Sequence, residues 1–200
     1  LEYLPKSITN LTLQAASTDL EVLETLPPNL TKLGLLNVDL NSQPERSTEE
    51  ILTCLPRTLT RLPHVFELMI QTEKHLLALP PSLTTLHLPR LSEDFVRLLP
   101  LNLTYLSTHR IGELTVHTLP SQLLSFRADA RISLQSLIML HESCPRLNTL
   151  QIQVGQGTYL SHIPSHITEL NLEGYRSYPS AIFARLPNLV SLRLSNATEI

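Results

Sequence analysis

The sequence predicts a right-handed α/β solenoid, with a concave parallel sheet of about nine strands and short helices on the convex side. Three observations support this fold class. A phrase containing a proline returns nine times in 200 residues, at intervals of 19 to 29 residues. Each proline is followed by apolar residues in the spacing L-x-x-L-x-L, and several are preceded by helix-capping residues. Such a period predicts stacked repeats, each contributing one strand and one return segment.

The strand of each repeat follows its proline. In "LPPSLTTLHL" at 79–88, Leu83, Leu86 and Leu88 hold the first, fourth and sixth positions of L-x-x-L-x-L. The fourth and sixth residues of a strand share one face, while the fifth and seventh point to the other face. Successive strands separated by a return segment must be parallel, and parallel strands need cover from those segments. We therefore expect one parallel strand per repeat, with its leucines buried.

The return segments carry helix start signals. The stretches "TEEILTCLP" (48–56), "TEKHLLALP" (72–80) and "SEDFVRLLP" (92–100) each begin with a hydroxyl residue followed by acidic residues. A hydroxyl satisfies free amides at a helix N-terminus and carboxylates favour it, so Thr48, Thr72 and Ser92 are predicted N-caps. Residues 128–145 show a longer helical pattern and should form the longest helix, whereas 36–47 read as an inserted loop.

The proline marks the corner between helix and strand. It cannot continue a helix, and it biases the residue before it toward an extended backbone. Threonine recurs at the second strand position, where a β-branched side chain suits a strand. We interpret these threonines as structural: Thr9, Thr31, Thr60, Thr84, Thr104 and Thr168.

One repeat has two possible registers. Aligning Leu59 and Leu62 with the strand keeps the repeat spacing and places Thr60 at the second position. Aligning Val65, Leu68 and Ile70 instead gives a more apolar strand. Spacing favours the first register and burial the second.

These repeats resemble the leucine-rich repeat family over essentially the whole chain. The resemblance implies a horseshoe-shaped solenoid, with residues 1–200 forming a single leucine-rich-repeat domain that is a fragment of a longer chain. Most repeats resemble the "LPxxLxxLxL" units of secreted bacterial ubiquitin-ligase effectors and some lower-eukaryote proteins. The repeats "CPRLNTLQI" (144–152) and "LPNLVSLRL" (186–194) are one residue shorter and resemble those of F-box-type proteins.

Composition and motifs narrow the classes of function. The formal net charge of −3 indicates neither a nucleic-acid nor a membrane partner. No Gly-rich phosphate loop, nucleophile elbow or CxxC motif occurs, and His162 and His166, four residues apart, are separated by the helix-breaking Pro164. We therefore expect no enzyme activity, metal, cofactor or small-molecule substrate.

The cysteines and asparagines indicate the cellular compartment of the protein. Cys54 and Cys144 lie four repeats apart, about 19 Å at a strand spacing of about 4.8 Å, whereas a disulfide needs Cα atoms within about 7 Å. Both thiols should be free. The asparagine ladder typical of extracellular members of the family is missing, although four N-x-T sequons begin at Asn10, Asn29, Asn102 and Asn196. We expect a cytoplasmic protein, and the sequons keep a secreted protein as the alternative.

The predicted binding surface is the concave face, formed by the second, third, fifth and seventh strand positions. Solenoids present many repeats together on such a face. The alternative is that its polar residues are simply solvated. The candidate partner-binding residues are Thr85, His87, Tyr105, His109, Arg127, Asp129, Gln151, Gln153, Glu169, Asn171 and Glu173.

The resemblance implies a protein–protein interaction module with a protein partner on the concave face. Its leading form is the substrate-recognition domain of an F-box-type ubiquitin ligase adaptor. The alternatives are the recognition domain of a secreted bacterial ubiquitin-ligase effector and a secreted receptor-like ectodomain.

Overall fold

The structure is a computed structural model in two compact units, Leu1–Pro89 and Arg90–Ile200. It describes residues 4–14, 21–36, 47–62, 70, 72–111, 119–153, 157–174 and 180–195. The predicted loop at 36–47 lies almost wholly outside these residues. That residues 1–200 form a single domain stays a prediction.

The described residues of the first unit form a parallel strand pair and three helices. Strands β1 (Asn10–Gln14) and β2 (Lys32–Leu36) pair with Leu11 opposite Leu33. The helices are α1 (Glu21–Glu24), α2 (Thr48–Thr53) and α3 (Glu73–Ala78). Strand β3 (Thr85–Leu91) begins in this unit and crosses its boundary.

The repeat with two possible registers adopts the one that its spacing favours. Arg61 forms isolated parallel bridges with Lys32 and Thr85, so residues 59–62 take the place of the strand. Leu59 and Leu62 are buried at 0% and 2% exposure. Residues 63–69, which contain most of the competing register, lie outside the described residues. Because this repeat contributes a bridge, the described part of the chain holds eight named strands, where about nine were predicted.

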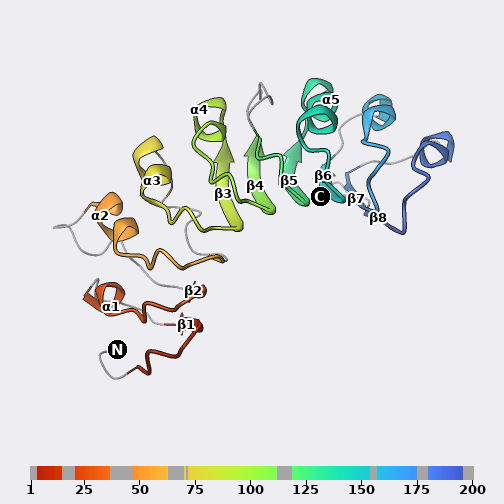
Figure 1. Ribbon diagram of the computed structural model, residues 1–200. Coiled ribbons are helices and arrows are strands. Elements are labelled where there is room, and N and C mark those ends of the chain that lie inside the picture. The colour runs from red at the N-terminus through yellow and green to blue at the C-terminus, as the bar shows by residue number, and fades with distance from the viewer. Residues whose placement is uncertain are drawn as a thin grey trace. The chain divides into compact units, whose positions relative to one another are not determined.

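The second unit contains a parallel sheet covered by helical segments. Strands β4 (Tyr105–Ile111), β5 (Ser125–Arg131), β6 (Thr149–Gln153), β7 (Glu169–Glu173) and β8 (Ser191–Ser195) pair in chain order. The helices α4 (Glu93–Val96) and α5 (Leu134–Ser143) and the 3-10 helices η2 (Gly157–His162) and η3 (Ser180–Arg185) lie on one side of it (Figure 1). Among the described helices α5 is the longest, as predicted.

Of the three predicted N-caps, one is confirmed, one is confirmed in position alone, and one is wrong. Thr72 caps α3, and its hydroxyl accepts a hydrogen bond from the amide of His75. Ser92 is the N-cap residue of α4, but its side chain makes no capping hydrogen bond. For α2 the cap is Ser47, not Thr48. The Ser47 hydroxyl accepts from the Glu50 amide, and the Glu50 carboxylate accepts from the Ser47 amide. This reciprocal capping box requires Ser and Glu three residues apart, which Ser47 satisfies and Thr48 does not.

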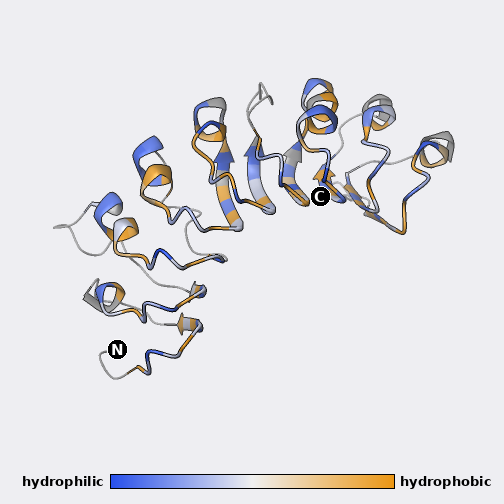
Figure 2. Cartoon of the chain, viewed as in Figure 1, coloured by the Kyte–Doolittle hydropathy of each residue, from blue (hydrophilic) through white to orange (hydrophobic). Residues whose placement is uncertain are grey.

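The core consists of the leucines that the repeat pattern predicts. On β7, Leu170 and Leu172 are 2% and 0% exposed, whereas Leu192 and Leu194 at the same positions of β8 are 41% and 42% exposed. Strand β8 is the last in the sheet order, so only one neighbouring strand covers its leucines. Figure 2 shows α5 with both hydrophobic and hydrophilic residues, as expected for a helix with one side on the core.

Four of the six threonines at the second strand position form a hydrogen-bond ladder, which confirms the structural interpretation of these four. Each hydroxyl donates to the backbone carbonyl of the equivalent residue in the preceding repeat, at 3.1 to 3.2 Å for Thr31, Thr60, Thr84 and Thr168. These hydrogen bonds are a second physical reason for threonine at this position, in addition to its preference for strands.

A second ladder runs beside it, from the residue before the first strand leucine. Asn29 Nδ2 donates to the Lys6 carbonyl at 3.2 Å, and Asn188 Nδ2 donates to the Ser165 carbonyl at 3.4 Å. At the same corner position, the hydroxyls of Thr58 and Ser82 donate to preceding carbonyls. The repeat wording "NLT" at 29–31 therefore places Asn29 in one ladder and Thr31 in the other.

Neither cysteine forms a disulfide, as the repeat count predicted: Cys144 is buried and Cys54 is half-buried. In the part of the chain that the structure describes, every helix is too short or too polar to cross a bilayer.

Candidate functional site

The candidate site is the polar face of the second unit, which we define as the third, fifth and seventh strand positions of β4 to β8. Nine of the eleven candidate residues belong to it: Tyr105, His109, Arg127, Asp129, Gln151, Gln153, Glu169, Asn171 and Glu173. Thr85 and His87 lie on β3 in the first unit, where both are half-buried. Contacts between side chains divide the polar face into two clusters.

The first cluster joins β4 and β5. Arg127 Nε donates to Asp129 Oδ1 at 2.8 Å, and His109 Nδ1 lies 2.8 Å from Asp129 Oδ2. The register of β5 against β6 shifts between Ala128 and Arg131. Asp129 holds the seventh position of β5, two residues from Arg127 on the same face. His109 holds the seventh position of β4 and lies 20 residues before Asp129, the offset at which β4 pairs with β5. The period of two therefore brings these three side chains together.

Electrostatics fix the charge of this cluster. Burial by itself would raise the pKa of Asp129, but hydrogen bonds from Arg127 and His109, with their positive charges, lower it below its ordinary value. The hydrogen bond to Asp129 in turn raises the pKa of Arg127, against the opposing effect of burial. At neutral pH the cluster therefore presents a carboxylate held by a guanidinium.

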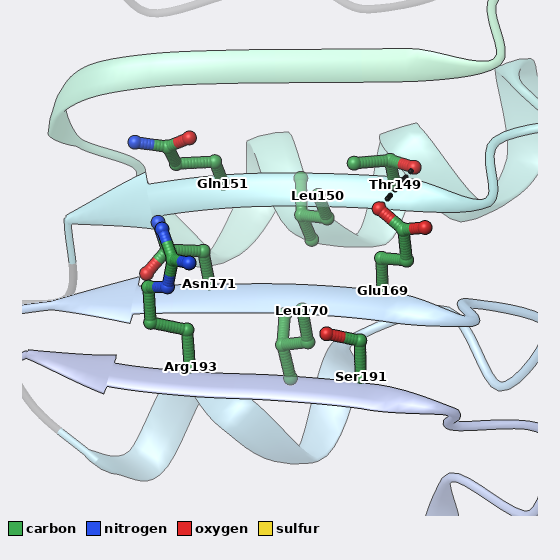
Figure 3. Close-up of a pocket in the computed structure, with 8 residues that line it drawn as sticks. All are labelled: Thr149, Leu150, Gln151, Glu169, Leu170, Asn171, Ser191 and Arg193. Carbon is green, nitrogen blue, oxygen red and sulfur yellow. Dashed lines mark hydrogen bonds between the residues drawn. The ribbon is translucent and has the colours of Figure 1, made fainter.

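The second cluster lies on β6, β7 and β8. Gln151 Nε2 donates to Glu173 Oε1 at 3.0 Å. The Thr149 hydroxyl donates to Glu169 Oε2 over a longer 3.4 Å (Figure 3). Both interactions run between β6 and β7, in the register that pairs Thr149 with Glu169 and Gln153 with Glu173.

The polar side chains of this cluster surround a shallow hollow of about 220 Å³. Figure 3 shows the polar side chains on its rim, with Leu150 and Leu170 at the strands beneath. Its lining residues are Thr149, Leu150, Gln151, Glu169, Leu170, Asn171, Ser191 and Arg193. The prediction included Gln151, Glu169 and Asn171, and it omitted Thr149, Ser191 and Arg193. The repeat pattern could have found all three, because Thr149 and Ser191 hold third positions, on β6 and β8, and Arg193 holds the fifth position of β8.

Asn171 is the unusual residue of the hollow. Its Oδ1 atom is buried and makes no hydrogen bond. The corner asparagines Asn29 and Asn188 instead bond the preceding repeat. Arg193 is the register neighbour of Asn171 on β8, and its side chain extends toward Asn171 in Figure 3. The Asn171 side chain thus has an acceptor without a hydrogen bond, whereas the side chains of Asn29 and Asn188 join neighbouring repeats.

The polar face offers charged and hydrogen-bonding side chains on neighbouring strands. Among the described residues, no three histidine, cysteine, aspartate or glutamate side chains are close enough together to hold a metal ion. Small-molecule sites typically enclose about 300 to 1,000 Å³ and are mostly apolar. The hollow on β6 to β8 is smaller, and its rim is polar.

Comparisons with known proteins identify the fold. No protein-family model and no curated protein sequence matches the chain. The crystal structure of the leucine-rich repeat-containing protein LegL7 from Legionella pneumophila matches 98% of this chain and 85% of that chain, with 17% identity and a TM-score of 0.55. A structure described as a novel circular LRR protein, CroV588, matches 98% of this chain and 35% of that chain, with 16% identity and a TM-score of 0.48.

Proposed function

From its leucine-rich-repeat fold, which the likeness to LegL7 shows and which confirms the predicted fold class, we propose that this chain is a protein–protein interaction module. Its partner would bind the polar face of the second unit. The observation that carries the proposal is a row of fifth-position side chains on four consecutive paired strands: Arg127, Gln151, Asn171 and Arg193. Adjacent strands lie about 4.8 Å apart, so one partner surface can contact several of these side chains together.

The size of the hollow favours a protein partner over a small ligand. The hollow of about 220 Å³ is smaller than the volume of about 300 to 1,000 Å³ that small-molecule sites usually enclose. A stable protein interface buries about 800 Å² on each partner, so a protein partner would also contact strands beside the hollow. The cluster of His109, Arg127 and Asp129 lies on the neighbouring strands and would extend the interface. Arginine is enriched at such interfaces, and the polar face contains Arg127 and Arg193.

The finer form of the proposal is the substrate-recognition part of an F-box-type ubiquitin ligase adaptor, in the cytoplasm and without catalytic activity. The shorter repeats at 144–152 and 186–194 support it, and they contribute two of the three strands around the hollow. The longer "LPxxLxxLxL" spacing of most other repeats favours the alternative, a recognition domain of a bacterial ubiquitin-ligase effector. For a cytoplasmic location, the support is that Asn29 and Thr31 of one sequon are used in the corner ladders.

A charge-reversal experiment tests the proposal. The variant Glu169→Lys with Arg193→Glu reverses two exposed charges of the polar face and keeps the net charge. Arg127 and Glu173 are left unchanged because both make hydrogen bonds within the face. The matched control is Glu142→Lys with Arg185→Glu, which reverses two exposed charges on the helical segments of the same unit.

Wild-type protein and both variants are immobilised and exposed to a lysate of the source cells. We expect the polar-face variant to lose a partner that wild type and control retain, while all three keep the same thermal midpoint, because exposed polar changes shift stability by under about 0.5 kcal/mol. Loss of the partner from the control alone would contradict the proposal.

A further inference from the structure

We propose that the hollow on β6, β7 and β8 is a subsite for an extended peptide segment that carries a basic and an acidic side chain two residues apart. The inference rests on the proposed function, because it specifies which part of a protein partner contacts this portion of the polar face.

The first step is the pair of charges on the rim. Glu169 and Arg193 both line the hollow and both are exposed. Other charges of the face are engaged: Asp129 is held by Arg127, and Glu173 accepts from Gln151. Within the described part of the chain, Glu169 has only the long 3.4 Å contact from Thr149, and no hydrogen bond or ion pair of Arg193 is seen. One carboxylate and one guanidinium are therefore available to a partner.

The second step is the spacing of these charges. Glu169 pairs with Ser191, and Asn171 pairs with Arg193, so Arg193 lies two residues further along the strand direction than Glu169. Two residues of a strand span about 6.6 to 6.8 Å, and side chains on one face of any extended peptide recur at this same interval. A basic side chain opposite Glu169 thus places an acidic side chain two residues away opposite Arg193.

The third step is Asn171, which lies two residues after Glu169 on β7 and beside Arg193 on β8. A carboxamide offers both a donor and an acceptor, so it can bond the amide and the carbonyl of an extended backbone. Its Oδ1 makes no hydrogen bond in the free protein. The terminal torsion of asparagine is broad, so rotation of the carboxamide toward the hollow presents this oxygen to a partner's N–H group. Asn171 would then read the backbone while Glu169 and Arg193 read the side chains.

Other simple ligands fit the charges less well. A phosphate or another anion would be attracted to Arg193 and repelled by Glu169 and Glu173. A polyamine would be attracted to the carboxylates and repelled by Arg193. A segment with both charges satisfies both rim residues, and its backbone satisfies Asn171.

A peptide array tests the inference. Eleven-residue peptides of threonine and valine, which favour extended chains, are immobilised with a central Lys-Thr-Glu, Lys-Thr-Lys, Glu-Thr-Glu or Thr-Thr-Thr. The fluorescently labelled chain of 200 residues is applied at low salt. We expect wild type to retain Lys-Thr-Glu about two- to fivefold better than the others, the range expected for one exposed charge pair.

Single variants then change the preference in opposite directions. Arg193→Glu leaves two carboxylates on the rim and should favour Lys-Thr-Lys. Glu169→Lys leaves two cations and should favour Glu-Thr-Glu. The control Glu142→Lys with Arg185→Glu should keep the wild-type order. Asn171→Ala should weaken retention of all four peptides, because the backbone contact is common to them.

The outcomes separate this inference from the proposed function. Equal retention of all peptides, no retention of any, or an order that the single variants leave unchanged would each overturn the subsite. If the peptide array fails but the variant Glu169→Lys with Arg193→Glu still loses the lysate partner, the interaction module is supported and the peptide subsite is rejected. If the peptide array fails and this variant retains the lysate partner, both proposals are rejected.

Discussion

Thr84 donates a hydrogen bond from its hydroxyl to the backbone carbonyl of Thr60 at 3.1 Å, one repeat earlier in the chain. The same carbonyl accepts the backbone amides of Thr84 and Thr85 at 2.8 and 3.2 Å. In the same way, the Thr60 hydroxyl donates to the Thr31 carbonyl, and the Thr31 hydroxyl donates to the Thr9 carbonyl. Consecutive repeats of the first unit are thus joined at one corner by three donors to each carbonyl.

Replacing Thr84 by Val should lower the free energy of unfolding by about 0.5 to 1 kcal/mol. Valine keeps the β-branched shape and removes only the hydroxyl. The loss is at the low end of the usual range for a hydrogen bond, because the Thr60 carbonyl keeps its two amide donors. Urea denaturation of both proteins measures the difference. A loss above about 2 kcal/mol would show that the hydroxyl has a further role.

Replacing Leu170 by Ala should cost about 2 to 5 kcal/mol of unfolding free energy. Leu170 is 2% exposed and lies on β7 between β6 and β8, so its removal leaves a cavity between repeats. The control is Ser191→Ala, an exposed position on the next strand, which should change stability by less than about 0.5 kcal/mol. Equal midpoints for the two variants in urea would refute the predicted repeat register.

His166 makes the fold sensitive to pH. Its ring stacks on His141 with 5.7 Å between ring centroids, and its Nε2 is buried without a hydrogen bond. Burial, together with the charge of His141, lowers the pKa of His166, against the opposing effect of a hydrogen bond to the Cys144 backbone. The unfolded chain therefore binds this proton more readily than the folded chain does.

The stability contributed by neutral His166 is fully present above the unfolded pKa of about 6.5 and is lost as the pH falls below it. Replacing His166 by Asn, the residue found at the same corner in Asn29 and Asn188, should flatten the decline of the melting temperature between pH 7 and 5. Thermal melts across this range measure it. An unchanged slope in the variant would assign the pH dependence to other groups.

The two thiols should differ in reactivity. Burial raises the pKa of Cys144 to about 12, and the residue is 0% exposed, whereas Cys54 is half-buried. Because the thiolate is the reactive form, iodoacetamide at pH 8 should label Cys54 alone in the folded protein and both cysteines in urea. Mass spectrometry of the digest distinguishes the sites. A peptide linking the two cysteines in an unreduced sample would contradict the repeat stacking.

The buried half of the structure could be predicted from sequence because the leucine spacing encodes it directly. Leu83, Leu86 and Leu88 were assigned to the core from L-x-x-L-x-L alone, and they are 0 to 1% exposed. The cap of α2 was missed by one residue, because the acidic residue three positions later selects Ser47. A sequence pattern therefore predicts which residues face the core more accurately than it predicts the residue at which a helix begins.

The candidate site was less predictable because the period tells which side chains share a face but not which of them form hydrogen bonds with one another. The period places His109, Arg127 and Asp129 on one face, but it does not tell that the Asp129 carboxylate contacts both of the other side chains. Ser107 holds a fifth position that should be exposed, yet it is only 5% exposed. Whether the Asn171 oxygen finds a donor depends on neighbouring side chains from other repeats, which no local pattern describes.

Site-specific photo-crosslinking tests the central claim, that a protein partner binds the polar face, most directly. A benzophenone amino acid replaces Ser191 on the polar face in one variant and Ala184 in helix η3 of the same repeat in another; both positions are exposed. After irradiation in the lysate of the source cells, we expect a discrete crosslinked protein from position 191, and none from position 184. A crosslink from position 184 with none from position 191 would contradict the account.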